Sequence, residues 1–581
     1  MAFDTIISGG IVVDGLGTAP RRADVGIRDG RITAIDESLT AIVAVGDVEI
    51  IDATGRLVTP GFVDVHTHYD GQATWDELLE PSTQHGVTTL VMGNCGVGFA
   101  PVRPDDHDSL IELMEGVEDI PGAALYEGLT WGWESFPDYL DVLESRRWAV
   151  DVGTQVAHGP LRRYAMGPAA STQAVASPDE IAEMSRIVRE AIDAGAFGFT
   201  TSRTLGHKAL DGTPVPGTFA TLDELTAIAN GVAAGGGRVM EFAAAGLARS
   251  DAPAAVADEF EWVGRLAGDT GVNTTFILLQ NHADPNRWRR EMHTAERWRS
   301  AGSPVFPLVA GRPFGVIWGW DVRHPFTARP TYRSIAGLPL SERLAELRDP
   351  SVRAAILADD DEPSDRAEAG QLAYIRMVLG DCHLISGTPD YEQPRERSIG
   401  FIAEATGRTT EEVCYDGLVE TDDAMLLYAL YNYTSWDHSV LHEQFQDRDA
   451  ILGLADGGAH VAFICDASIP TFMLTHWARD RSRGPRLDLA ETVRRLTSQP
   501  ADLYGLTDRG RITVGARADI NVIDHAHLRL TTPGAVHDLP MGGTRLLQPA
   551  FGYDLTMVAG DVTRRNGRDT GARPGRLLRA S

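Results

Sequence analysis

The sequence has 581 residues, of which 43% are hydrophobic and 23% charged, the composition of an ordinary globular protein. Its 82 acidic and 52 basic residues give a formal charge of −30, which disfavours binding to nucleic acid phosphates. No apolar run approaches the ~20 residues that cross a membrane. The four cysteines are widely spaced without a CxxC pair, and no signal-peptide pattern opens the chain. These features predict a soluble, cytoplasmic protein without nucleic-acid or membrane partners.

Short apolar runs broken by glycine-containing turns occur at both ends of the chain. They are DTIISGGIVVDG, ADVGIRDGRITAI and VEIIDATGRLV at the start, and GRITVGARADINVIDHAHLRL and YDLTMVAGDVTRRNGRDTGARPG near the end. Such runs predict β-strands, and strands from the two ends can share one sheet. We therefore expect residues 1–56 and 506–581 to be the two parts of one small β domain.

Strand-like runs alternate with amphipathic stretches between these ends, where one helix should begin at Ser177 with Glu180 three residues on. Eight alternations predict an α/β protein with a closed (β/α)8, TIM-like barrel over residues 57–505. Two insertions, near 101–148 and 312–448, are expected in loops around the barrel mouth. The eight runs are LVTPGFVDVH, VTTLVMGNC, DVGTQVAH, AFGFTTSR, RVMEFAAA, NTTFILLQNH, PVFPLVAG and AILGLADGG.

Two histidines follow the first of these strands, in PGFVDVHTHYD. Residues two apart on a strand point to the same face, so His66 and His68 should converge at the strand end. Neutral imidazole is a good ligand for Zn²⁺. The plain alternative is two histidines in a loop, but the apolar strand before them favours a metal site.

Other strand ends carry further candidate ligands. Cys95, in GNCG, could bind a cation as a thiolate or be a small buried thiol. Asp456, in ADGG at the last strand, would adjoin the first strand in a closed barrel; it could bind the metal and take a proton from water, or form a turn. His282 could complete the metal site or start a loop, and His460 is a lesser candidate. Glu241, inside an apolar run, needs a buried partner such as a metal or an arginine.

Several motifs together resemble the amidohydrolase superfamily, and within it the D-aminoacylase (N-acyl-D-amino-acid deacylase) group. They are HTHYDGQ, GNCG, AHGPLR, TSRTLGH, PVPGTFA, ADGG and GRITVGARADINVID, which span nearly the whole chain. The resemblance implies a (β/α)8 barrel, a small β-sandwich formed from both termini, and one or two Zn²⁺ ions. It also implies hydrolysis of the amide bond of an N-acyl amino acid, of the D series, by a metal-activated water.

The resemblance also carries over to individual positions. It makes Asp456 the metal-oriented general base. It gives Cys95 the place of the carboxylated lysine of most superfamily members, and the only lysine, Lys208, lies in a loop past its strand end. The implied metal ligands are His66, His68, Cys95, His282 and Asp456.

The chain departs from the group's pattern at three strand ends. QNHAD stands where the group has an SHHK-like sequence, Phe306 and Leu308 cannot bind a metal, and Glu241 stands where histidine is expected. One ligand is therefore missing or is replaced by a histidine from an insertion. The candidates for that replacement are His324, His383, His438 and His442.

Substrate contacts are expected from Arg203, His158 and Glu241. A substrate carboxylate would favour an arginine, for which Arg312 and Arg323 are further candidates by loop position. Aromatic residues of the insertions could line the mouth or pack the insertions onto the barrel. They are Trp131, Trp133, Trp318, Trp320, Tyr431, Tyr433 and Trp436.

Two other functions stay open at this point. One is a cyclic-amide, imide or lactone hydrolase on the same scaffold, which product analysis would distinguish. The other is a binding or assembly protein on a degenerate barrel, which would purify with little zinc. The expected partner is a small-molecule substrate, and the insertions could also mediate a homo-oligomer.

Overall fold

Strands from both ends of the chain pair in one sheet of the computed structural model, which describes residues 3–40, 48–172, 175–248, 251 and 259–580. β5 (Leu57–Pro60) pairs antiparallel with β18 (Ile520–Ile523), so that Val58 lies opposite Val522. Buried side chains from both segments, among them Val25 and Met557, share one core. The other strands of this sheet are β1 (Thr5–Val12), β2 (Arg21–Arg28), β3 (Arg31–Asp36), β4 (Glu49–Asp52), β23 (Tyr553–Val558), β24 (Asp561–Arg565) and β25 (Arg568–Asp569).

Two parallel sheets occupy the middle of the chain. The first contains β6 (Phe62–Asp64), β7 (Val87–Met92) and β8 (Asp151–Thr154). The second contains β9 (Val156–Ala157), β10 (Gly198–Ser202), β11 (Val239–Ala243), β12 (Asn273–Ile277), β13 (Val305–Val309) and β17 (Ile451–Leu452). Each of the eight apolar runs of the sequence contains at least one of these strands. The strands are shorter than the runs, because the last residues of most runs already belong to the loop that follows.

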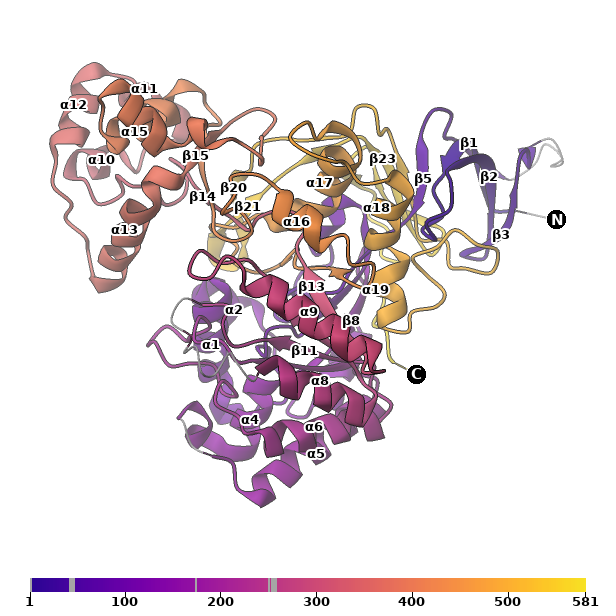
Figure 1. The fold of residues 1–581 in the computed structure, drawn as a ribbon. Coiled ribbons are helices and arrows are strands. Elements are labelled where there is room, and N and C mark those ends of the chain that lie inside the picture. The colour runs from indigo at the N-terminus through magenta and orange to yellow at the C-terminus, as the bar shows by residue number, and fades with distance from the viewer. Residues whose placement is uncertain (1–2, 41–47, 173–174, 249–250, 252–258, 581) are drawn as a thin grey trace.

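Helices cover the parallel strands, as Figure 1 shows for α5, α6, α8 and α9. α5 (Pro178–Asp193) begins with the capping box that the sequence predicts: the Ser177 hydroxyl accepts from the Glu180 amide, and the Glu180 carboxylate accepts from Ser177. The other helices of this part are α4 (His158–Met166), α6 (Leu222–Ala234), α8 (Glu259–Thr270), α9 (Arg287–Ser300), α16 (Ser439–Gln444), α17 (Ile469–Phe472), α18 (Leu489–Leu496) and α19 (Ser498–Leu503), and a π-helical turn spans Met473–Asp480.

The two insertions fold differently. Residues 101–148 form α1 (His107–Glu118), α2 (Gly122–Gly128) and α3 (Phe136–Glu144), and α1 buries Leu110 and Met114 in the same core as the parallel strands. Most of the second insertion instead forms a lobe that stands apart at the upper left of Figure 1, while its last part, with α16, packs in the main core. The lobe has its own core, in which Trp320 stacks on Phe326 and Tyr332. Trp318 lies in that core too, so these two tryptophans pack the lobe.

The lobe combines a small antiparallel sheet with several helices. Its strands are β14 (Gly315–Trp318), β15 (His383–Ile385) and β16 (Met425–Ala429). Its helices are α10 (Pro330–Ile335), α11 (Leu340–Leu347), α12 (Pro350–Ala358), α13 (Arg366–Val378), α14 (Ile399–Thr406) and α15 (Thr410–Glu420). Four short strands elsewhere form two antiparallel pairs, one inside the other in the chain: β19 (Arg529–Leu530) with β22 (Ala550–Phe551), and β20 (Gly534–Leu539) with β21 (Gly543–Leu547).

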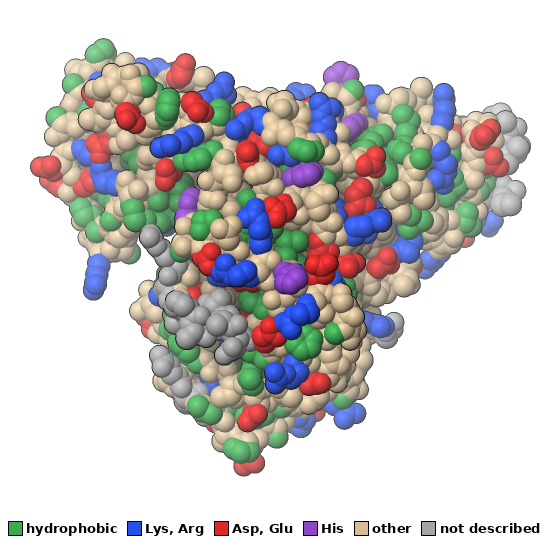
Figure 2. Space-filling model, viewed as in Figure 1, with side chains coloured by type: hydrophobic (Ala, Val, Ile, Leu, Met, Phe, Trp, Pro, Cys, Tyr) green, Lys and Arg blue, Asp and Glu red, His purple; other side chains and the backbone are tan. Residues whose placement is uncertain are grey.

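The surface mixes the two signs of charge. On the face drawn in Figure 2, acidic and basic side chains alternate and form no continuous patch of one sign. Among the described residues, no helix is both long enough and apolar enough to span a membrane.

Candidate active site

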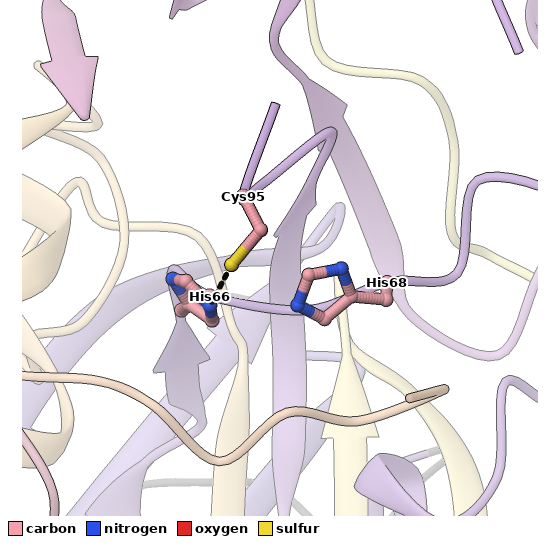
Figure 3. Close-up of side chains that lie close together, drawn as sticks. All are labelled: His66, His68 and Cys95. Atoms are coloured by element: carbon pink, nitrogen blue, oxygen red, sulfur yellow. Dashed lines mark hydrogen bonds between the residues drawn. The ribbon is translucent and has the colours of Figure 1, made fainter. Parts of the chain in front are cut away.

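His66, His68 and Cys95 point toward one another at the ends of β6 and β7 (Figure 3). Each offers one ligand atom, and these atoms all lie within 4.8 Å of one another. The Cys95 sulfur is 3.5 Å from Nε2 of His66, and none of the three residues is more than 6% exposed. Two imidazole nitrogens and a sulfur at these spacings suit a single transition-metal ion.

The residue between the histidines fixes their direction. The amide and hydroxyl of Thr67 both donate to the Val91 carbonyl, at 3.2 and 2.8 Å. The amide of His68 donates to the Gly457 carbonyl at 2.8 Å, and Thr67 and Gly457 form a parallel bridge. Because Thr67 faces β7, the side chains on either side of it turn to the opposite face together.

The turn that carries Cys95 is clamped by its neighbours. Nδ2 of Asn94 donates to the Thr67 carbonyl at 2.9 Å, and Nε2 of Gln155 donates to Oδ1 of Asn94 at 2.9 Å. Cys95 itself has a left-handed backbone, with φ of 54°, a conformation that non-glycine residues adopt only when their surroundings enforce it. Gly96 follows because a Cβ there would come within 2.8 Å of the Ser202 amide.

Asp456 faces both histidines from the loop after β17. Its Oδ1 is 3.3 Å from Nε2 of His66 and 3.9 Å from Nε2 of His68. Its backbone is also left-handed, with φ of 49°. Burial raises the pKa of Asp456 to about 7, although the charge of His66 opposes the rise. The loop therefore brings a carboxylate close to the Nε2 atoms of both histidines.

Each histidine meets a second carboxylate on its other nitrogen. Nδ1 of His66 is 2.9 Å from Oε1 of Glu241, on β11, and Nδ1 of His68 is 3.3 Å from Oε1 of Glu118, the last residue of α1. Glu241 thus meets a histidine, where the sequence suggested a metal or an arginine. Glu118 was missed by the sequence analysis, since no motif or spacing distinguishes it within an acidic insertion.

The pKa shifts of this group are those of a buried site that a bound cation would stabilise. Burial raises the pKa of Cys95 to about 12 and that of Glu118 well above its usual value, the latter with a further contribution from Asp456. Burial lowers the pKa of His66, but Glu241 and Cys95 outweigh it and leave that pKa well above its usual value. A divalent cation among these groups would favour the charged thiolate and carboxylates.

His282, expected as a ligand, lies apart from this group. Its side chain is exposed, because the preceding residue holds the loop. Nδ2 of Asn281 donates to the Gly246 carbonyl at 3.1 Å, and Oδ1 of Asn281 accepts from the Asp284 amide at 2.8 Å. Asn281 therefore takes the buried place at this strand end, and the next side chain turns outward.

Arg203, expected to contact substrate, is engaged in structural contacts. Its guanidinium donates to the carbonyls of Thr218 and Ala220, at 3.1 and 2.7 Å, and pairs with Glu259 at 3.2 Å. These bonds close the loop that follows β10. The guanidinium therefore has its hydrogen-bonding capacity largely satisfied within the protein.

Of the three remaining candidates for substrate contact, two are also bonded within the protein. His158 is fully buried, with its ring nitrogens 2.8 Å from the Thr201 hydroxyl and 3.0 Å from the Glu224 carboxylate. Arg312 is also fully buried and pairs with Asp466 at 2.9 Å. The side chain of Arg323 is 44% exposed, with its nearest carboxylate, on Asp119, 3.8 Å away.

The four insertion histidines do not join the His66 cluster. His438 belongs to a second group, with Glu392 and His476, whose ligand atoms also lie within 4.8 Å of one another. Arg481 donates to both Glu392 oxygens, at 3.1 and 3.0 Å, so a guanidinium already neutralises that carboxylate. The other three lie elsewhere: His324 and His383 in the lobe, and His442 on α16.

Comparison with known proteins identifies the family. The model of the amidohydrolase family matches residues 49–564. The D-aminoacylase of Alcaligenes xylosoxydans xylosoxydans is 33% identical over 527 residues, which cover 90% of this chain and 88% of the relative. The N-acyl-D-glutamate deacylase of the same organism is 28% identical over 526 residues, covering 90% and 87%.

A solved structure agrees with these relatives. The N-acyl-D-glutamate deacylase from Bordetella bronchiseptica, complexed with zinc and a phosphonate inhibitor, aligns over 100% of both chains with a TM-score of 0.64 and 25% sequence identity. The match of family model, relatives and fold extends over nearly the whole length described above. The chain belongs to the amidohydrolase family.

Proposed function

We propose that this chain is a zinc-dependent hydrolase that cleaves the amide bond of N-acyl amino acids, of the D series, with a metal-activated water. The observation that carries the proposal is the convergence of His66, His68, Cys95 and Asp456 at the ends of β6, β7 and β17. Two relatives that align with 90% of the chain are named D-aminoacylase and N-acyl-D-glutamate deacylase, and the amide of an N-acyl amino acid is linear. This favours a linear amide over a cyclic amide or a lactone.

The residues present fit zinc. Nitrogen, sulfur and oxygen donors are the usual zinc ligands, and Oδ1 of Asp456 is buried without a hydrogen-bond partner among the described residues. We assign His66, His68, Cys95 and Asp456 as the residues that would hold one Zn²⁺, and we omit His282. Bound zinc lowers the pKa of a water from ~15.7 toward ~7 and polarises the substrate carbonyl.

The chain's own residues supply the proton transfers. We assign Asp456 as the general base that accepts the proton of the attacking water and returns it to the leaving nitrogen. The left-handed backbone of Asp456 places its carboxylate at the cluster, with Oδ1 3.3 Å from Nε2 of His66. Burial of the whole group keeps bulk water away and strengthens each electrostatic contact.

We also infer that the two parallel sheets close into one eight-stranded (β/α)8 barrel. Three features support closure: β8 and β9 are nearly continuous in the chain and count as one strand of the eight, the Gln155 amide donates to the Met92 carbonyl at 3.0 Å, and Thr67 bridges Gly457. The sheet shared by residues 1–56 and 506–581 would then be the β-sandwich domain. Because β5 belongs to that sheet, we move the start of the barrel domain from residue 57 to Gly61.

A metal and substrate assay tests the function. The purified protein is analysed for metal and assayed against matched N-acyl-D- and N-acyl-L-amino acids and against cyclic imides. We expect zinc in the preparation, hydrolysis of the D series, loss of activity on chelation and recovery with added Zn²⁺. Protein without zinc that hydrolyses no N-acyl amino acid would overturn the proposal. A cytoplasmic location and a homo-oligomer stay predictions.

A further inference from the structure

Glu118 contacts the cluster of candidate metal ligands from outside the parallel strands. It is the last residue of α1, in the first insertion, and is 1% exposed. Its Oε1 lies 3.3 Å from Nδ1 of His68, and its Oε2 lies 3.6 Å from Nε2 of His460. Its backbone carbonyl accepts a hydrogen bond from the His460 amide. One residue therefore touches both a cluster histidine and the loop after β17.

The contact with His68 bears on how that ring can bind a cation. A neutral imidazole binds a metal through one nitrogen only, and a carboxylate that accepts the proton of the other nitrogen fixes which one is free. Nδ1 of His68 faces Glu118, so Nε2 is left toward Asp456. His66 repeats the arrangement, with Glu241 facing its Nδ1.

The contact with His460 bears on Asp456. The loop after β17 has left-handed backbones at Leu454, Asp456 and His460, with φ of 59°, 49° and 48°. Three such residues in seven positions need external support to persist. The backbone bond and the close carboxylate of Glu118 supply support at the far end of this loop.

Packing alone does not account for a carboxylate here. Among the described residues, the ion pairs of Glu118 are with His68 and His460, and none is with an arginine or the lysine. A buried carboxylate without a cationic partner is costly. A leucine or glutamine would fill the same space at lower cost if the residue served only to pack α1.

We propose that Glu118 is a positioning residue of the zinc site, which holds His68 with Nε2 toward the ion and anchors the loop that carries Asp456. The inference rests on the proposed zinc site. It makes the first insertion a part of the metal centre, where the sequence suggested only the rim of the mouth. It also gives the two histidine ligands matching carboxylate partners from unrelated parts of the chain, β11 and α1.

Zinc affinity tests the proposal independently of turnover. Metal-free wild type, Glu118→Gln and Glu118→Ala are titrated with Zn²⁺ in competition with a chromophoric chelator. Glu112→Gln, an exposed position of the same helix, is the matched control. We expect Glu118→Ala to weaken zinc binding by about 10–100-fold and Glu118→Gln to weaken it less, because the amide keeps an oxygen facing Nδ1 of His68, which lies 3.3 Å from the carboxylate in the wild type. The control should bind zinc as the wild type does.

The outcomes separate the two claims. Wild-type zinc affinity in a folded Glu118→Ala protein overturns the positioning role, as does an equal loss in Glu112→Gln. If the alanine variant does not fold, the glutamine variant decides: affinity no weaker than wild type overturns the proposal. A wild-type protein that binds no zinc overturns the proposed function itself.

Discussion

Nε2 of His66 lies 3.3 Å from Oδ1 of Asp456, although one residue follows β6 and the other follows β17. We predict that Asp456→Asn keeps the fold and loses turnover. An amide has nearly the same shape but cannot take a proton from water, so kcat should fall by about 10²–10⁴-fold. Zinc analysis and kcat on the same preparation check this. A variant with kcat near that of the wild type would remove Asp456 as the base.

Cys95 is predicted to be the one cysteine on which zinc depends. Cys95→Ala should lose most of its bound zinc, because alanine supplies no ligand atom in place of the sulfur. Cys414→Ala is the matched control, since Cys414 is also buried but lies in the core of the separate lobe. Metal analysis of both variants after dialysis checks the prediction. Equal zinc in the two variants would contradict it.

The second group of possible ligands, Glu392, His438 and His476, is predicted to make the free energy of unfolding depend on pH. Burial raises the pKa of Glu392, but hydrogen bonds from His476 and Arg481 outweigh it and hold that pKa well below the usual 4.5. A carboxyl whose folded pKa is lowered stabilises the protein above its unfolded pKa, and this stabilisation disappears as the pH falls toward the folded pKa. Glu392→Gln should therefore cost about 3 kcal/mol at neutral pH, and the difference should shrink below pH 4.5.

Thermal melting across that range measures the effect. Glu443→Gln is the control, because Glu443 pairs with Arg289 at a site where both side chains are about half exposed. Exposed pairs contribute little, about 0–1 kcal/mol. A melting difference for Glu392→Gln that stays constant from neutral to acid pH would show that the charge of Glu392 has no part in it.

The Trp320→Ala substitution is predicted to destabilise the lobe without disturbing the zinc site. Trp320 is 4% exposed and packs among Phe326, Tyr332 and Tyr415. Trp320→Ala leaves a large cavity and should destabilise the lobe by about 3–5 kcal/mol. Because the lobe core is separate from that of the parallel strands, hydrogen exchange should accelerate there while zinc content stays unchanged. Loss of zinc in this variant would show that the two cores are coupled.

Short-range patterns in the sequence were reliable guides to this structure. The eight apolar runs contain the parallel strands, and the two-residue spacing of His66 and His68 just after β6 suffices to bring their side chains together. The sequence could not locate Glu118, because the position of a helix end depends on how a whole insertion packs. Nor could it foresee that the hydrogen bonds of Asn281 turn His282 outward. The sequence also cannot tell whether the aromatic residues of an insertion line the barrel mouth or fill a core. Trp320 fills a core.

The pairing of β5 with β18 sets an order of events during synthesis. The edge of β5 that will receive β18 emerges from the ribosome long before its partner. At about 5–20 residues per second, the ribosome needs on the order of tens of seconds to make the chain between them. During that time an apolar strand offers unpaired backbone groups to any neighbouring nascent chain. We therefore expect the yield of native protein in a cell to depend in part on β5 staying free of other chains until translation is nearly finished.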